Sequence, residues 1–304
     1  MDFQLTEDQS ALRDGVRDLL EGRFGRTALR AAVDAAGHEG TAVLDRALWR
    51  ELGAAGFFAL TLPEAEGGVG LGLPDAVLAF EEAGRVLLPG PLVATFLAAG
   101  EVPGAASGEA VVTSADGALV AWLDEADVVR GGDVAGAVPT RSVDPLTPLH
   151  RLPGATGDQG GPDRPVAGAP TGAGALLTAA EQLGSATRTT EMAVQYARER
   201  AQFGQVIGAF QAVKHLCAQM LVRAELARAA VYAAAVTGDP LEACGAKLLA
   251  DDAAVRNARD CLQVHGGMGF TWEADVHLHL KRAWVRAAAG RSAGDAEEAL
   301  AAAL

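Results

Sequence analysis

The sequence predicts a mainly α-helical protein in three parts. We expect an N-terminal helical domain over residues 1–99, a reduced β-domain with a linker over 100–170, and a C-terminal four-helix bundle over 171–304. Half of the 304 residues are apolar and only 5% are aromatic, and a chain rich in Ala and Leu favours helices. Apolar residues recur at three- and four-residue spacing in the outer parts, whereas short apolar runs in the middle are typical of strands.

The composition also limits the classes of partner. A formal net charge of −14 argues against nucleic acid or an anionic membrane surface, so a phosphorylated ligand would need locally placed cations. The first residues lack a signal-peptide pattern, and no uncharged apolar run is long enough for a transmembrane helix. The three cysteines lie in helical patterns without a Cys-x-x-Cys pair, as expected of reduced thiols. We therefore expect a cytoplasmic protein with no membrane insertion.

The first part begins with a helix start signal. Thr6 and Gln9 have the spacing of a capping box, and apolar residues at helical spacing follow them. The Gly-rich segment 63–70 is predicted as a loop because it lacks the strand and the Lys-Ser/Thr of a phosphate loop. Further helices are expected over 27–36, 42–55, 74–85 and 92–99.

In the middle part, the runs 110–112, 118–123 and 128–129 predict strands of a small sheet. We interpret Trp122 as a core anchor of this sheet. Residues 154–174 are rich in Gly, Pro and Ala, which predicts a linker.

The last part is helical throughout. A long helix is predicted over 175–201, and the alternating spacing of the next helix forms a packed seam at Phe210, Val213, Cys217, Met220 and Ala224. Gly238-Asp239-Pro240 separates the second helix from the third, and the fourth begins near Ala274. Four such helices predict an antiparallel bundle.

Two motifs occupy the junctions between these helices. The first runs Arg-Ala-Gln-Phe-Gly from Arg200 and ends with Phe-Gln at Gln211, and the second runs Gln-Val-His-Gly-Gly-Met-Gly-Phe from Gln263. An Arg guanidinium is suited to a phosphate, and glycines let backbone approach a ligand closely. Together they indicate a ligand with a diphosphate and polar edges.

In this order the motifs resemble the C-terminal domain of the flavin-dependent acyl-CoA dehydrogenases, and the first hundred residues resemble the N-terminal domain of that family. In the family, the corresponding residues contact the diphosphate and adenosine of FAD across a dimer interface. By this resemblance, the cofactor-binding residues are Arg200, Gln202, Phe203, Gln211, Gln263, Gly266 and Gly267.

The chain departs from the family in two respects. Its middle part is short and lacks the Thr-Glu-Pro-x-x-Gly-Ser-Asp-like and Trp-x-Thr/Ser segments that wrap the isoalloxazine ring. The two positions at which the family places its catalytic Glu correspond here to Gly290 and the vicinity of Gly174. The nearest carboxylates are Glu181, which we expect at the surface, and Glu273, which corresponds to a structural Glu of the family.

These features favour a non-catalytic subunit of a heteromeric acyl-CoA dehydrogenase. The resemblance implies an FAD shared with a larger catalytic subunit in an α2β2 assembly, α,β-desaturation of an acyl-CoA in β-oxidation, and an electron-transfer acceptor protein. Such pairs degrade steroid side chains or rings in actinobacteria. Two alternatives stay open: a self-sufficient homomeric dehydrogenase with a relocated base, and a helical scaffold with no flavin role.

No other site is predicted. His277 and His279, two residues apart on a helix, point in different directions, which argues against a metal site. Ser185 has no Gly-x-Ser-x-Gly context, so a nucleophilic serine is unsupported.

Overall fold

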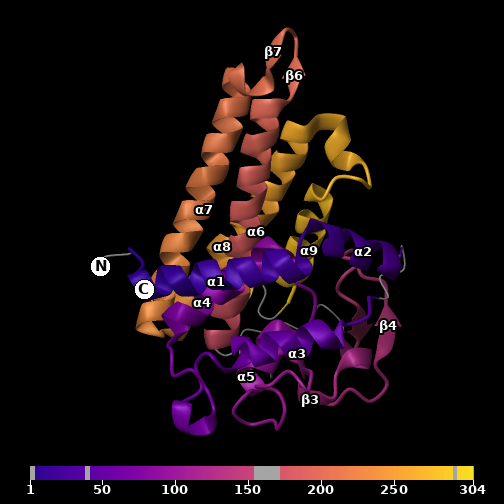
Figure 1. The fold of residues 1–304 in the computed structure, drawn as a ribbon, viewed down its shortest axis with the longest axis vertical. Coiled ribbons are helices and arrows are strands. Elements are labelled where there is room, and N and C mark those ends of the chain that lie inside the picture. The colour runs from indigo at the N-terminus through magenta and orange to yellow at the C-terminus, as the bar shows by residue number, and fades with distance from the viewer. Residues whose placement is uncertain (1–3, 38–41, 154–171, 290–292, 304) are drawn as a thin grey trace.

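The computed structural model describes residues 4–37, 42–153, 172–289 and 293–303. Helices dominate these residues, and the short strands lie in the middle of the chain (Figure 1). The predicted fold class, mainly α with a small β region and a C-terminal helical bundle, is confirmed. No helix in the described ranges has both the length and the apolar character needed to cross a membrane.

The N-terminal part consists of helices α1 (Glu7–Phe24), α2 (Arg26–Ala36), α3 (Arg46–Ala54), α4 (Leu73–Arg85) and α5 (Leu92–Ala98). The capping box before α1 is present, since Gln9 N donates to Thr6 Oγ1 at 3.1 Å and Thr6 N donates to Gln9 Oε1 at 3.2 Å. Helix α3 begins four residues later than predicted. Asp45 caps it instead, accepting from the backbone amides of Ala47 and Leu48.

The strands form small separate sheets rather than the single sheet that was predicted. Strands β1 (Val112–Ala115) and β3 (Val128–Gly131) pair in parallel, and β2 (Leu119–Ala121), β5 (Leu149–Arg151) and β4 (Val138–Thr140) pair antiparallel in that order. Trp122 is 2% exposed and belongs to the main hydrophobic core, so its interpretation as a core anchor is confirmed.

The bundle consists of α6 (Gly172–Glu199), α7 (Gln211–Thr237), α8 (Pro240–His265) and α9 (Val276–Ala287). Asp239 caps α8 and Pro240 occupies its first turn, as predicted. In Figure 1, α6 and α7 extend side by side well beyond the N-terminal helices, so one end of the bundle is free. A short helix, α10 (Ala293–Ala302), follows α9; helix was predicted to the end of the chain, but not as a fifth separate helix. Of the expected linker, residues 154–171 lie outside the described residues, and Gly172 already belongs to α6.

The two helical parts meet where α4 crosses α6. A Cβ atom at Gly184 would lie 1.9 Å from the carbonyl oxygen of Glu81, and one at Gly84 would lie 2.0 Å from that of Glu181. The two backbones are therefore in direct contact, and only glycine fits at either position. This crossing joins the N-terminal helices to the bundle in one hydrophobic core.

Candidate functional site

The first motif folds into a hairpin at the free end of the bundle. Strands β6 (Ala201–Gln202) and β7 (Gln205–Val206) pair antiparallel, and Phe203 and Gly204 form the turn between them (Figure 1). Both turn residues have positive φ, 55° and 80°, as a type I′ hairpin requires. The hairpin was not predicted, because each strand has only two residues and Phe203 is unusual at a position of positive φ; Gly204 was the one local signal for it.

The side chains of this hairpin face outward. The Phe203 side chain is 92% exposed, and its ring meets that of Phe210 edge-to-face at 6.2 Å between centroids. Gln202 makes only a local hydrogen bond, from Nε2 to the Ala201 carbonyl at 2.9 Å. Arg200 is exposed, and its guanidinium has no ion pair or hydrogen bond within the described part of the chain. Arg200 and Phe203 are thus both exposed at this end, and the Arg200 guanidinium has no partner within the described part of the chain.

The second motif ends α8. Gly266 terminates the helix with a φ of 59°, and the turn η5 (Gly266–Phe270) follows. A Cβ atom at Gly267 would meet nothing within 4 Å, and its φ is not in the left-handed region. Neither packing nor backbone conformation therefore requires glycine at 267, which leaves close approach by a ligand as a reason for it. Gln263 is exposed one turn earlier.

The two motifs share the same end of the bundle. The rings of Tyr196 on α6 and His265 on α8 stack with centroids 4.1 Å apart. His265 Nδ1 also hydrogen-bonds the Cys261 carbonyl at 2.8 Å. Beneath them, a second hydrophobic core centred on Met220 and Cys261 joins all four helices. Gln211, at the start of α7, is exposed beside the hairpin. The structure therefore brings the sequence-predicted cofactor residues to one end of the bundle.

The expectation that Glu181 lies at the surface is wrong. Glu181 is 5% exposed, and Arg286 Nη2 donates to its Oε1 at 2.5 Å. Burial raises the pKa of Glu181, while the charges of Arg286 and Arg282 oppose that rise. Burial likewise lowers the pKa of Arg286 to about 10. This carboxylate is enclosed in an ion pair, so it is poorly placed to take a proton from a bound substrate.

The other candidate base positions give no better carboxylate. Glu273 is exposed in the segment before α9, and its backbone carbonyl accepts from Arg26 at 3.3 Å. Gly174 lies in the first turn of α6. Gly290 falls outside the described residues.

A buried polar layer surrounds Glu181 between α6, α8 and α9. Lys247 Nζ contacts Asp251 Oδ2 at 2.5 Å, and Gln182 Nε2 donates to Asp251 Oδ1 at 2.8 Å. The Asp251 side chain is only 15% exposed, although it lies in a pair of adjacent aspartates on α8, a pattern typical of a solvated helix face. Burial is expected to raise the pKa of Asp251, and the Lys247 charge opposes that rise.

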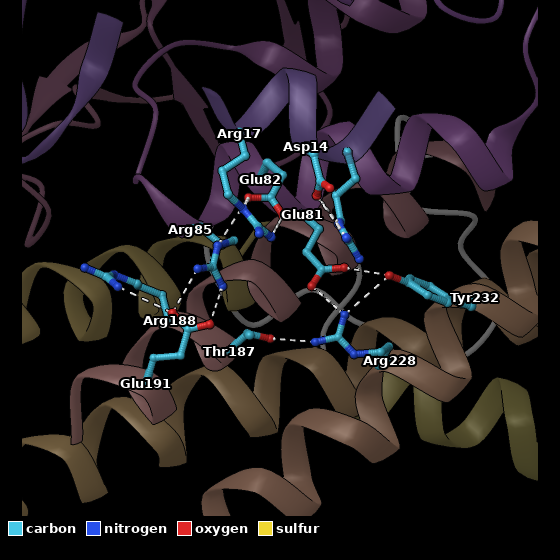
Figure 2. A network of polar contacts seen from close by, with 11 residues as sticks. Asp14, Arg17, Glu81, Glu82, Arg85, Thr187, Arg188, Glu191, Arg228 and Tyr232 are labelled. Carbon is cyan, nitrogen blue, oxygen red and sulfur yellow. Dashed lines mark hydrogen bonds and ion pairs between the residues drawn. The ribbon is translucent and has the colours of Figure 1, made fainter. Parts of the chain in front are cut away.

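A second polar network lies where α1 and α4 meet the bundle (Figure 2). Arg17 pairs with Glu82 through two hydrogen bonds of 2.9 and 2.6 Å, and Arg228 Nη1 donates to Glu81 Oε1 at 2.6 Å. Tyr232 donates to the other oxygen of Glu81 at 3.0 Å. Burial and the neighbouring Glu81 carboxylate raise the pKa of Tyr232, so its hydroxyl stays protonated.

This network is structural rather than catalytic. Glu81 and Glu82 are 4% and 2% exposed, and every carboxylate oxygen of the pair has a donor within the molecule (Figure 2). Arg85 extends it to α6 through two hydrogen bonds to Glu191. Two adjacent carboxylates inside an apolar helix were the sequence signal for it, because buried carboxylates need cationic partners.

Histidine and serine chemistry has no support. The Ser185 hydroxyl and His279 Nδ1 hydrogen-bond each other at 2.8 Å, with side chains 0% and 3% exposed, so the pair is buried core. Among the described residues, no group of His, Cys, Asp and Glu side chains has the arrangement of a metal site.

Comparison with known proteins accounts for this arrangement. Residues 6–106 match the family profile of the acyl-CoA dehydrogenase N-terminal domain, and residues 165–301 match that of the acyl-CoA dehydrogenase C-terminal domain. The chain is 38% identical to acyl-CoA dehydrogenase IpdE2 of Mycobacterium tuberculosis, over 91% of each chain.

Solved structures show the same fold. Butyryl-CoA dehydrogenase from Megasphaera elsdenii superposes with a TM-score of 0.81 at 20% identity, covering 100% of this chain and 99% of that one. The ChsE4–ChsE5 complex from Mycobacterium tuberculosis gives a TM-score of 0.80 at 24% identity, covering 99% and 98%. With both domain profiles matched and a relative aligned along almost its whole length, the chain belongs to the acyl-CoA dehydrogenase family, flavin-dependent oxidoreductases that act on the CH–CH bond of acyl thioesters.

Proposed function

We propose that this chain is a subunit of an FAD-dependent acyl-CoA dehydrogenase that completes the FAD site of a larger partner and lacks a catalytic base of its own. The observation that carries the proposal is the free end of the bundle. Arg200 and Phe203 are exposed there, and the Arg200 guanidinium has no partner within the described residues. The described strands of the middle part, at most four residues long, give little surface to enclose a flavin ring.

Each motif residue has a defined task at such a shared site. The bound FAD would accept the hydride that leaves the substrate. Arg200 would hold the diphosphate with its guanidinium fork, and Phe203 would cover an apolar edge of the cofactor. The amides of Gln202, Gln211 and Gln263 would donate to polar edges, and Gly266 with Gly267 would let the backbone approach.

The ion pair of Glu181 supports the second half of the proposal. Removal of an α proton needs a carboxylate that reaches the substrate and carries a matched pKa. Glu181 is held by Arg286 inside the bundle, and the base is therefore assigned to the partner. Glu273 is exposed but projects from a segment outside the bundle core.

A partner has an apolar surface to bind. Leu221, Val222 and Leu226 on α7 are 53–57% exposed, although they stand on a helix whose opposite face is core. Large exposed apolar side chains grouped on one helix are typical of interfaces. We propose an α2β2 assembly with the bundles at its centre, as a relative of similar fold is itself a two-protein complex. Its substrate would be an acyl-CoA derived from a steroid, as in actinobacterial metabolism. Its electrons would pass to an electron-transfer protein in the cytoplasm.

Co-expression with a larger acyl-CoA dehydrogenase chain from the same organism tests the proposal. The chain alone should purify without stoichiometric FAD, whereas the complex should be yellow and reduce a dye with acyl-CoA. A yellow homo-oligomer that turns over acyl-CoA would support the homomeric alternative instead. A complex that contains no flavin, or no complex at all, would leave the scaffold alternative.

Arg200 provides the matched mutational test. A hydrogen bond to a charged group contributes roughly 1.5–3 kcal/mol, so Arg200→Ala should weaken FAD binding by the complex about ten- to a hundredfold. Arg200→Lys should recover only part of that loss, because a point charge cannot reproduce the fork. Arg198→Ala is the control, since Arg198 is also exposed at the end of α6 but lies outside the motif. Equal FAD affinities for the Ala variants would contradict the assignment.

A further inference from the structure

The turn that carries the second motif is held from outside the bundle by α2. Arg30 Nη2 donates to the Trp272 carbonyl at 2.6 Å, and Arg30 Nη1 lies 3.5 Å from Asp275 Oδ1. Arg26 Nε contacts Asp275 Oδ2 at 2.5 Å. Two arginines of the N-terminal helical part thus bind, through hydrogen bonds and ion pairs, the segment that directly follows η5.

The Trp272 ring also contacts these cationic side chains. The guanidinium carbon of Arg30 lies 5.9 Å from the ring centroid, and Lys281 Nζ lies 4.9 Å from it. The His277 ring stacks on Trp272 with centroids 5.0 Å apart. The Arg30 and Asp275 side chains are 18% and 12% exposed, so their attraction is less screened than that of a surface pair.

The turn itself has few anchors of its own. Within η5, Met268 and Phe270 are 49% and 74% exposed, and of its five residues Gly269 alone is buried. The position of the turn is therefore set by its two ends. One end is α8, and the other is the segment that Arg26 and Arg30 hold.

We propose that Arg30, assisted by Arg26, is a positioning residue for FAD binding: through Trp272 and Asp275 it fixes the turn that presents Gly266 and Gly267. This inference rests on the function proposed above, because the turn matters for flavin only if it contacts flavin. Arg30 itself is 242 residues away in sequence from Trp272, and it belongs to neither motif. The N-terminal helices would thereby take part in a site formed by the bundle.

Hydrogen–deuterium exchange tests the clamp without flavin. In the purified chain, Arg30→Ala should speed exchange in peptides covering 263–275 and leave those covering the β6–β7 hairpin unchanged. Arg30→Lys should restore part of the protection, because an ammonium can satisfy Asp275 or the Trp272 carbonyl but not both with a planar fork. Arg50→Ala is the control, since Arg50 on α3 forms an exposed pair with Glu109 far from the turn.

FAD titration of the co-expressed complex tests the consequence. Arg30→Ala should weaken FAD binding roughly two- to thirtyfold, the range for coupled positions that do not touch the ligand, and Arg50→Ala should not. Unchanged exchange in 263–275 would overturn the inference. If Arg30→Ala speeds exchange in 263–275 but leaves FAD affinity unchanged, the inference is also overturned. If Gln263→Ala loses FAD in the same experiment, the proposed function still stands. If neither Gln263→Ala nor Arg30→Ala alters FAD binding, the flavin role of this turn fails, and the inference with it.

Discussion

Replacing Gly184 by alanine should destabilise the protein, although the same change in most helices stabilises them. The added Cβ would lie 1.9 Å from the Glu81 carbonyl oxygen and 2.9 Å from the Arg85 amide nitrogen. Both obstacles are backbone atoms of α4, which cannot rotate aside. The helices must therefore separate by more than an ångström, or the α6 backbone must bend.

The expected magnitude combines two opposing terms. Overpacking of a well-packed site costs roughly 1–3 kcal/mol, and the upper end applies here because the clash is with backbone. Alanine stabilises the helix by about 1 kcal/mol relative to glycine, because its helix propensity is higher. The net loss for Gly184→Ala should be about 2 kcal/mol of unfolding free energy. Gly15→Ala is the matched control, because Gly15 is exposed within α1 and nothing lies within 4 Å of its Cβ position. This change should be stabilising by about 1 kcal/mol.

Urea unfolding followed by circular dichroism measures both variants against the parent chain. The reciprocal variant Gly84→Ala, whose Cβ would lie 2.0 Å from the Glu181 carbonyl oxygen, should behave like Gly184→Ala. The double variant should cost less than the sum, because one separation of the helices relieves both clashes. If Gly184→Ala is as stabilising as Gly15→Ala, α4 and α6 are not in backbone contact and the reasoning is refuted.

Three further predictions follow from the polar and exposed side chains. Arg228→Ala should lower the free energy of unfolding in urea by about 3 kcal/mol, because it leaves the buried Glu81 without its cation. The control Arg50→Ala removes an exposed ion pair and should lower it by less than about 1 kcal/mol. Equal losses in the two variants would contradict the argument. Burial and nearby arginines lower the pKa of His279 from 6.5 to about 3, so its neutral form contributes stability above pH 6.5 that is lost as the pH falls below that value. Between pH 6.5 and pH 5 the loss should be ~2 kcal/mol, and a His279→Gln variant with the same pH profile as the parent would disprove it. Phe203→Ala should leave the thermal midpoint unchanged, since that side chain is 92% exposed, but should weaken FAD binding by the complex roughly two- to tenfold; a lowered midpoint with intact FAD binding would assign the ring to packing.

Local chemistry made most of the elements readable in the sequence. The capping box at Thr6 and the Asp239-Pro240 start of α8 act within a few residues, and each appears where it was predicted. Of the seam predicted along α7, Met220 and Ala224 are buried, whereas Phe210 precedes the helix and packs on Phe203. The two motifs could be recognised, and their location at helix junctions was correct, because glycines and helix ends are also local features. Their assignment to FAD stays a prediction of the resemblance.

Tertiary structure alone decided the environment of the charged side chains. The sequence left Glu181 at the surface because α6 is rich in Ala around its whole circumference, so no face of the helix stood out as the buried one. Its cationic partner, Arg286, is 105 residues later in the chain, and Gly84, whose Cβ position lies against the Glu181 backbone, comes about a hundred residues earlier. The same is true of Arg30 and Trp272, which no local pattern connects. The residues around a carboxylate or guanidinium in the sequence do not identify its partner. The pairing depends on where the whole fold places the two charges and on how far it removes them from water.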